Sequence, residues 1–160
     1  MLVALIASLI GEPRVPEVAF SAVAAGVLVT MMDGVDGWLA RRHRIASAFG
    51  ARFDMEIDAL LILVLAVLSW QFGKAGAWVV LSGLLRYAFV AAGSWAAWMN
   101  APLPASRRRQ TICVIQTAAL TLVMLPAIAP PVSTVVAAAS LCALVCSFLV
   151  DILWLWRHAP

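Results

Sequence analysis

Residues 17–42 read EVAFSAVAAGVLVTMMDGVDGWLARR, an apolar run whose end carries two aspartates, two glycines and two arginines. The apolar part is close to the roughly 20 residues that a helix needs to cross the hydrocarbon core of a bilayer. Aspartates are costly inside a membrane, and glycines weaken a helix. The stretch therefore marks either the point where a helix leaves the lipid or a place where acidic side chains are held for a purpose.

The composition of the whole chain predicts an integral membrane protein. Of its 160 residues, 64% are hydrophobic and only 12% are charged. A soluble domain of this length would expose far more charge. The three cysteines all lie in apolar segments, and their spacing does not resemble a zinc site, so we expect them to pack as small membrane residues.

Apolar segments of membrane-spanning length predict the fold class, an all-α polytopic bundle in a single domain, residues 1–160. Five segments are each near the length of a spanning helix: 17–40, 54–72, 76–99, 111–129 and 132–156. Residues 1–10 are apolar but too short to span, and they lack the features of a signal peptide. We interpret them as the second half of a first helix whose beginning is missing.

Basic residues predict the orientation of these helices, since cytoplasmic connections are enriched in lysine and arginine. If the segments alternate in direction, eight basic residues fall on one side of the membrane and two on the other. The eight are Arg41, Arg42, Arg44, Arg52, Arg107, Arg108, Arg109 and Arg157, and the two are Arg14 and Lys74. The connections at 41–52 and 101–110 are therefore predicted to be cytoplasmic, and the aspartates of the opening stretch lie at a cytoplasmic helix end.

A second pair of aspartates follows the connection at 41–52. Asp33 and Asp36 are three residues apart, and Asp54 and Asp58 are four apart, so each pair occupies one face of its helix. The short connection predicts that the two helices are antiparallel neighbours with all four carboxylates at similar depth. Glu56 is expected to point the other way, as a solvated charge at a helix end.

Four converging carboxylates would repel each other without a cation among them. Oxygen-only ligands favour magnesium, manganese or calcium, and magnesium often completes its coordination with substrate phosphates. This chemistry predicts a diphosphate substrate, and Gly37 and Gly50 would leave room for it near the backbone. The alternative is that the acids are helix-end charges neutralised by nearby arginines.

The spacing Asp33-x2-Asp36-Gly37-x2-Ala40-Arg41-x8-Gly50-x3-Asp54-x3-Asp58 resembles the signature of the CDP-alcohol phosphatidyltransferases. The resemblance implies six transmembrane helices, commonly in a homodimer, with the motif on the second and third. It also implies transfer of a phosphatidyl group from CDP-diacylglycerol, or a similar CDP-linked lipid, to a small alcohol, with release of CMP. Expected cofactors are Mg²⁺ or Mn²⁺, and the expected location is the bacterial inner membrane with the site facing the cytoplasm. No nucleic-acid partner is expected.

The same resemblance assigns roles to the motif residues. The metal ligands would be Asp33, Asp36, Asp54 and Asp58. Asp58 would also be the base that takes the proton of the acceptor hydroxyl. The residues fitting around the CDP moiety would be Gly37, Ala40, Gly50 and Arg41.

Basic residues elsewhere in the chain suggest the nature of the acceptor. Arg86 lies near the middle of an apolar segment, where an unpaired guanidinium is expensive. It either pairs with a buried acid, for which Asp151 is the obvious candidate, or it binds substrate together with one or more of Arg107, Arg108 and Arg109. Guanidinium groups suit phosphate, and the pattern resembles the acceptor pockets of relatives that use glycerol 3-phosphate or inositol phosphate. The alternative for the three consecutive arginines is that they set topology and contact lipid headgroups.

The sequence departs from the family pattern in two places, and it leaves two other functions open. The first helix begins partway through, and Gln110 stands where relatives often carry a lysine. The alternatives to an active enzyme are a catalytically inactive family member and a divalent-cation-binding membrane protein. A cation path is not expected, because the far halves of the helices, such as LILVLAVLSW at 61–70, are almost wholly apolar.

Overall fold

The computed structural model describes residues 3, 6, 8–10, 16–43, 48–101, 103–104 and 106–158. Within these ranges, only the backbone is described for residues 16, 33–43, 48–49, 51–52, 54, 97 and 100. Of the predicted half-helix at 1–10, Val3 and Ile6 are helical and buried in the core. Its remaining positions, apart from 8–10, lie outside the described residues.

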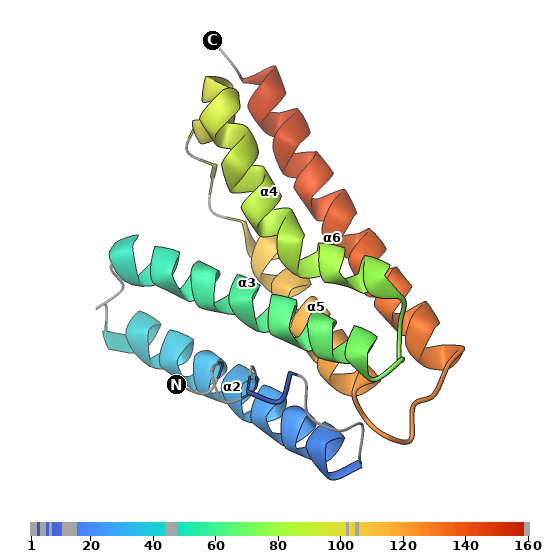
Figure 1. The fold of residues 1–160 in the computed structure, drawn as a ribbon. Coiled ribbons are helices and arrows are strands. Elements are labelled where there is room, and N and C mark those ends of the chain that lie inside the picture. The colour runs from blue at the N-terminus through green and yellow to red at the C-terminus, as the bar shows by residue number, and fades with distance from the viewer. Residues whose placement is uncertain are drawn as a thin grey trace.

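The described chain contains helices and no strand, which confirms the predicted all-α class. The α-helices are α2 (Pro16–His43), α3 (Ala48–Gln71), α4 (Leu81–Trp95), α5 (Arg107–Val123) and α6 (Val132–Arg157). Two 3-10 helices flank α4, namely η1 (Ala77–Val80) and η2 (Ala97–Asn100). In Figure 1, α2 and α3 lie side by side, α4 and α6 rise together away from them, and α5 lies where the two pairs meet.

Two helical segments of the described chain are long and apolar enough to cross a membrane. They are Ala77–Trp95, which joins η1 to α4, and Val132–Arg157, which is α6. A shorter apolar stretch, Glu17–Met32, makes up much of α2. The predicted arrangement of five full spans and a partial first helix is therefore not established by the structure, and it stays a prediction.

Helix α3 lies at the centre of the bundle, and its composition explains why. Its second half is apolar on almost every face, as is typical of a helix surrounded by others. The buried residues of this part are Ala59, Leu61, Ile62, Val64, Leu65, Ala66 and Leu68. Contacts to α2, α4, α5 and η1 cover them, so α3 fixes where the other helices stand around the site.

The end of α3 is fixed by a glycine and a lysine. Gly73 has a φ of +67°, and the amides of Gly73 and Lys74 donate to Trp70 O and Ser69 O. This is the Schellman pattern, which ends a helix at a residue that tolerates left-handed backbone. The Lys74 Nζ then donates to Leu125 O at 2.9 Å and Ile128 O at 2.6 Å, which ties this turn to the connection between α5 and α6.

Candidate active site

The eight motif residues lie at one end of the α2–α3 pair. Asp33, Asp36, Gly37, Ala40 and Arg41 belong to the last turns of α2, and Gly50, Asp54 and Asp58 belong to the first turns of α3. As expected, α2 and α3 are neighbours, and the end of one and the start of the other lie at the same end of the pair (Figure 1). Among the four aspartates, Asp58 is the one whose side chain the structure describes. Those of Asp33, Asp36 and Asp54, and of Ala40 and Arg41, lie outside that description.

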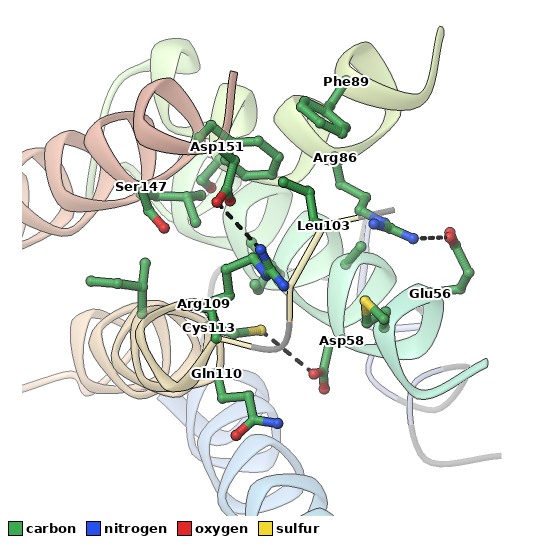
Figure 2. A pocket seen from close by; sticks show the side chains of 18 residues that line it. Glu56, Asp58, Arg86, Phe89, Leu103, Arg109, Gln110, Cys113, Ser147 and Asp151 are labelled. Carbon is green, nitrogen blue, oxygen red and sulfur yellow. Dashed lines mark hydrogen bonds and ion pairs between the residues drawn. The ribbon is translucent and has the colours of Figure 1, made fainter. Parts of the chain in front are cut away.

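Next to Asp58 the structure contains a cavity of about 770 Å³ (Figure 2). Four helices and the segment before α5 form its walls. The lining residues are Met55, Glu56, Asp58, Ala59 and Ile62 of α3, Ser82, Arg86 and Phe89 of α4, Leu103 and Ser106 before α5, Arg109, Gln110, Ile112 and Cys113 of α5, and Leu144, Ser147, Phe148 and Asp151 of α6. Both acids and guanidinium groups therefore face a space large enough for a small polar molecule.

Asp58 is half-buried on the α5 side of α3. The Cys113 thiol donates to its Oδ2 across 3.5 Å, and Figure 2 shows the two side chains meeting between the helices. A thiol is a weak donor, so the main effect of this contact is to orient the carboxylate. Asp58 lines the cavity, next to the end of the α2–α3 pair where the other three aspartates lie.

Arg86 pairs with Glu56, so of the two alternatives for Arg86 the pairing with Asp151 is wrong. The Nη2 of Arg86 donates to Glu56 Oε1 at 2.6 Å. Glu56 does point to a different side of α3 from Asp58, as its spacing predicts. That side is covered by α4, so Glu56 meets Arg86 there and is not simply a solvated helix-end charge (Figure 2).

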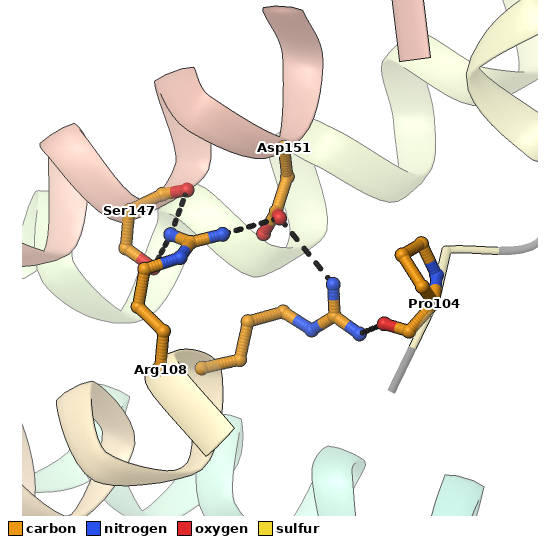
Figure 3. A network of polar contacts seen from close by, with 5 residues as sticks. Pro104, Arg108, Ser147 and Asp151 are labelled. Atoms are coloured by element: carbon orange, nitrogen blue, oxygen red, sulfur yellow. Dashed lines mark hydrogen bonds and ion pairs between the residues drawn. The ribbon is translucent and has the colours of Figure 1, made fainter. Parts of the chain in front are cut away.

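Asp151 belongs instead to a network that joins α5 to α6 (Figure 3). Its Oδ1 accepts from Arg108 Nη2 at 2.5 Å and from Arg109 Nη1 at 3.3 Å. Arg108 also donates to Ser147 O at 2.6 Å and to Ser147 Oγ at 2.5 Å, and Arg109 donates to Pro104 O. The Asp151 side chain is only 10% exposed, so its charge is compensated by two guanidinium groups as a buried carboxylate requires.

The network separates the three consecutive arginines by position. Arg107 is exposed and does not line the cavity. Arg108 donates hydrogen bonds to Ser147 and Asp151, so it links α5 to α6. Arg109 lines the cavity beside Asp151. Of the four arginines predicted to bind an acceptor, Arg86 and Arg109 therefore face the cavity.

Replacement of Asp151 by asparagine tests the network. Asn keeps the shape, but it leaves the guanidinium groups of Arg108 and Arg109 close together without a counter-charge. Because both arginines are about a third exposed, we expect a loss of about 1 kcal/mol and a lower unfolding temperature in detergent. Glu17→Gln removes the same charge at an exposed position of α2 and should leave that temperature unchanged. Equal unfolding temperatures for the two variants would contradict a stabilising network.

Whether the residues fit a divalent cation depends on the donor set. Among the side chains that the structure describes, no three His, Cys, Asp or Glu residues are grouped to hold a metal. Three of the four predicted ligands are outside that set. The fourth, Asp58, lines the cavity, and carboxylate oxygens are what Mg²⁺ and Mn²⁺ prefer. The four aspartates offer carboxylate oxygens, and they lie at the same end of the α2–α3 pair. Both features fit such an ion.

Sequence reasoning missed Glu56 and Cys113 as residues of the site. A weak signal existed for Cys113, because it lies four residues after Arg109 and therefore on the same face of α5. Ser147 and Asp151 show the same spacing on α6. Nothing in the local sequence shows that Cys113 meets Asp58 or that Glu56 meets Arg86.

Comparisons with known proteins give a family and a relative. The family described as CDP-alcohol phosphatidyltransferase matches residues 1–150. The chain is also similar to the CDP-diacylglycerol--glycerol-3-phosphate 3-phosphatidyltransferase of Bacillus subtilis (strain 168), with 28% identity over 72 residues. That stretch is 45% of this chain and 37% of the relative, so the match spans well under half of the relative's length. No solved structure matches the chain.

Proposed function

Since the chain belongs to the CDP-alcohol phosphatidyltransferase family, a family of transferases, we propose that it acts in phospholipid biosynthesis. The proposed reaction moves a phosphatidyl or similar substituted phosphate group from CDP-diacylglycerol, or a related CDP-linked donor, to an alcohol, and it releases CMP. The observation that carries this proposal is the position of Asp58, a motif residue, in a cavity that also contains Arg86 and Arg109.

In the proposed step, the acceptor hydroxyl oxygen attacks the phosphorus that carries the diacylglycerol. A new P–O bond forms, and the bond from this phosphorus to the oxygen shared with the second phosphate breaks, so its electron pair leaves with CMP. The hydroxyl proton passes to a carboxylate oxygen of Asp58, which acts as the general base. The contact with Cys113 helps to hold that carboxylate at the cavity.

The remaining motif residues would bind the donor. Asp33, Asp36, Asp54 and Asp58 would hold Mg²⁺ or Mn²⁺, which would neutralise the diphosphate and stabilise the CMP leaving group. Gly37, Ala40 and Gly50 would allow the CDP moiety to approach the backbone, and Arg41 would lie close to it. Their shared position at one end of the α2–α3 pair supports this assignment.

The acceptor is proposed to carry a phosphate group. Arg86 and Arg109 face the same cavity as Asp58, and guanidinium groups bind phosphate oxygens in pairs. Arg107 and Arg108 are less suited to binding the acceptor phosphate, because neither lines the cavity. The printed name of the Bacillus subtilis relative specifies glycerol 3-phosphate, which makes that compound the first candidate, with inositol phosphate as the second.

The setting of the reaction is proposed to be a membrane. Two candidate membrane helices and the family both indicate a membrane protein. We further propose a single domain built as the six-helix bundle of the family, in a homodimer in the bacterial inner membrane. The distribution of arginines supports a site on the cytoplasmic side, where a water-soluble acceptor enters while acyl chains stay in lipid.

The proposed function is tested by measuring CMP release from the purified full chain. The protein in detergent or lipid nanodiscs is supplied with CDP-diacylglycerol, Mg²⁺ or Mn²⁺, and one alcohol at a time. We expect CMP and the matching lipid product with glycerol 3-phosphate or inositol phosphate, and little with glycerol, serine or inositol. CMP release with none of the alcohols would overturn the enzymatic proposal in favour of an inactive or cation-binding protein.

A further inference from the structure

Arg86 lies in the cavity with one donor occupied and its neighbouring donor without a partner. The Nη2 of Arg86 contacts Glu56, while Nε is buried and has no hydrogen-bond partner within the described part of the chain. Nε and Nη2 form the edge of the guanidinium that binds two oxygens of one anion side by side. Glu56 therefore occupies one of the two donors, Nη2. Because a buried donor without a partner is costly, an anion that accepts from both Nε and Nη2 is favoured.

The two carboxylates beside the cavity arginines differ in how firmly they are held. Asp151 is 10% exposed and contacts both Arg108 and Arg109. Glu56 is 49% exposed and makes a single contact to a guanidinium that is itself 28% exposed. An ion pair of such exposure shifts an equilibrium by a factor of only about two to five, so a phosphate group that engages both donors can displace it.

We propose that Glu56 is a specificity-determining residue that holds Arg86 at the cavity and competes with phosphate for it. The proposal rests on the proposed function in taking the phosphate to be that of the acceptor. The Glu56 carboxylate occupies Nη2 while no acceptor is bound, and a phosphate dianion replaces it by bonding to Nε and Nη2 together. A neutral alcohol, such as glycerol or inositol, has no charge with which to displace the carboxylate.

The test is binding of inorganic phosphate to the purified full chain in detergent, measured by calorimetry without any CDP-linked donor. Glu56→Gln keeps an oxygen that can accept from Arg86 but removes the competing charge. We expect it to lower the Kd for phosphate about two- to fivefold. Arg86→Met should weaken phosphate binding, and Glu56→Gln should bring no gain when combined with Arg86→Met. Glu17→Gln removes one charge from an exposed position away from the cavity and is the matched control.

Each outcome decides the proposal. An unchanged or higher Kd in Glu56→Gln overturns it, as does an equal gain in the Arg86→Met background or in Glu17→Gln, because a general charge effect would then be sufficient. Failure of both wild type and Glu56→Gln to bind phosphate overturns it as well. The melting temperature of each variant shows whether it is folded, and Glu56→Ser is the second variant if Glu56→Gln is not.

Catalysis separates this inference from the proposed function. If CMP release is absent but the phosphate Kd values follow the expected pattern, the competition stands and the proposed reaction fails. If CMP is released but Glu56→Gln leaves the KM for glycerol 3-phosphate unchanged, the reaction stands and the competition fails. Where both hold, Glu56→Gln lowers the KM for glycerol 3-phosphate by the same factor as the phosphate Kd and leaves the KM for CDP-diacylglycerol unchanged.

Discussion

Asp58→Asn is expected to lower the rate of CMP release at least about 100-fold while the helices remain folded, because a positioned general base contributes about 10²- to 10⁴-fold. The amide has nearly the same shape as the carboxylate, but it cannot accept the hydroxyl proton. Its oxygen can still accept the Cys113 thiol hydrogen, so the α3–α5 contact survives. The loss should therefore appear in kcat and not in the unfolding temperature.

The measurement is CMP release under saturating donor and acceptor, with Glu17→Gln as a charge-matched control on an exposed part of α2. Raising the Mg²⁺ or Mn²⁺ concentration distinguishes the two roles given to Asp58. A variant that has only lost a metal ligand recovers activity at high metal, whereas one that has lost its base does not. A kcat within tenfold of wild type would exclude Asp58 as the general base.

The parts of the site that sequence predicts are those set by local spacing. Periodicity along one helix shows which residues share a face, so the spacing of 33 and 36 and of 54 and 58 places each aspartate pair on one face. The short connection between the helices then places both pairs at the same end of the helix pair. The helices themselves were also predicted, because apolar length is a local property. The predicted segment 54–72 covers α3 except for its first six residues, and 132–156 corresponds closely to α6.

The parts that sequence does not predict are contacts between helices distant in the chain. Glu56 and Arg86 are 30 residues apart, and Arg108 and Asp151 are 43 apart. Rotation of each helix about its own axis decides which face meets which neighbour, and that rotation is set by packing. Arg86 was correctly expected to need a partner or a ligand, but two acids were available to it. Packing of α4 on α3 brings Arg86 to Glu56. Packing of α5 on α6 brings Arg108 and Arg109 to Asp151.

Gly83→Ala is expected to destabilise the protein by about 2 kcal/mol and to reduce activity, although alanine is the better helix former. A Cβ at residue 83 would lie 2.4 Å from Leu63 Cα and 2.5 Å from Leu63 Cβ, so α4 and α3 would have to separate. Overpacking of this kind costs about 3 kcal/mol, and the helical preference of alanine returns about 1 kcal/mol. The clash wins because it involves backbone, which cannot rotate away.

Gly26→Ala is the matched control, since it is the same substitution in another buried helical position. There the new Cβ would lie 3.0 Å from Thr121 Oγ1 and 3.3 Å from Thr121 Cγ2, both side-chain atoms that need to shift by only a few tenths of an ångström. We expect its unfolding midpoint in detergent to stay close to wild type, while that of Gly83→Ala falls. Gly83 is three residues from Arg86 on the same face of α4, so separating the helices also moves Arg86 away from Asp58 on α3, which lines the same cavity. Gly83→Ala should therefore raise the KM for the acceptor, and an unchanged midpoint and KM would show that α3 and α4 do not depend on this close approach.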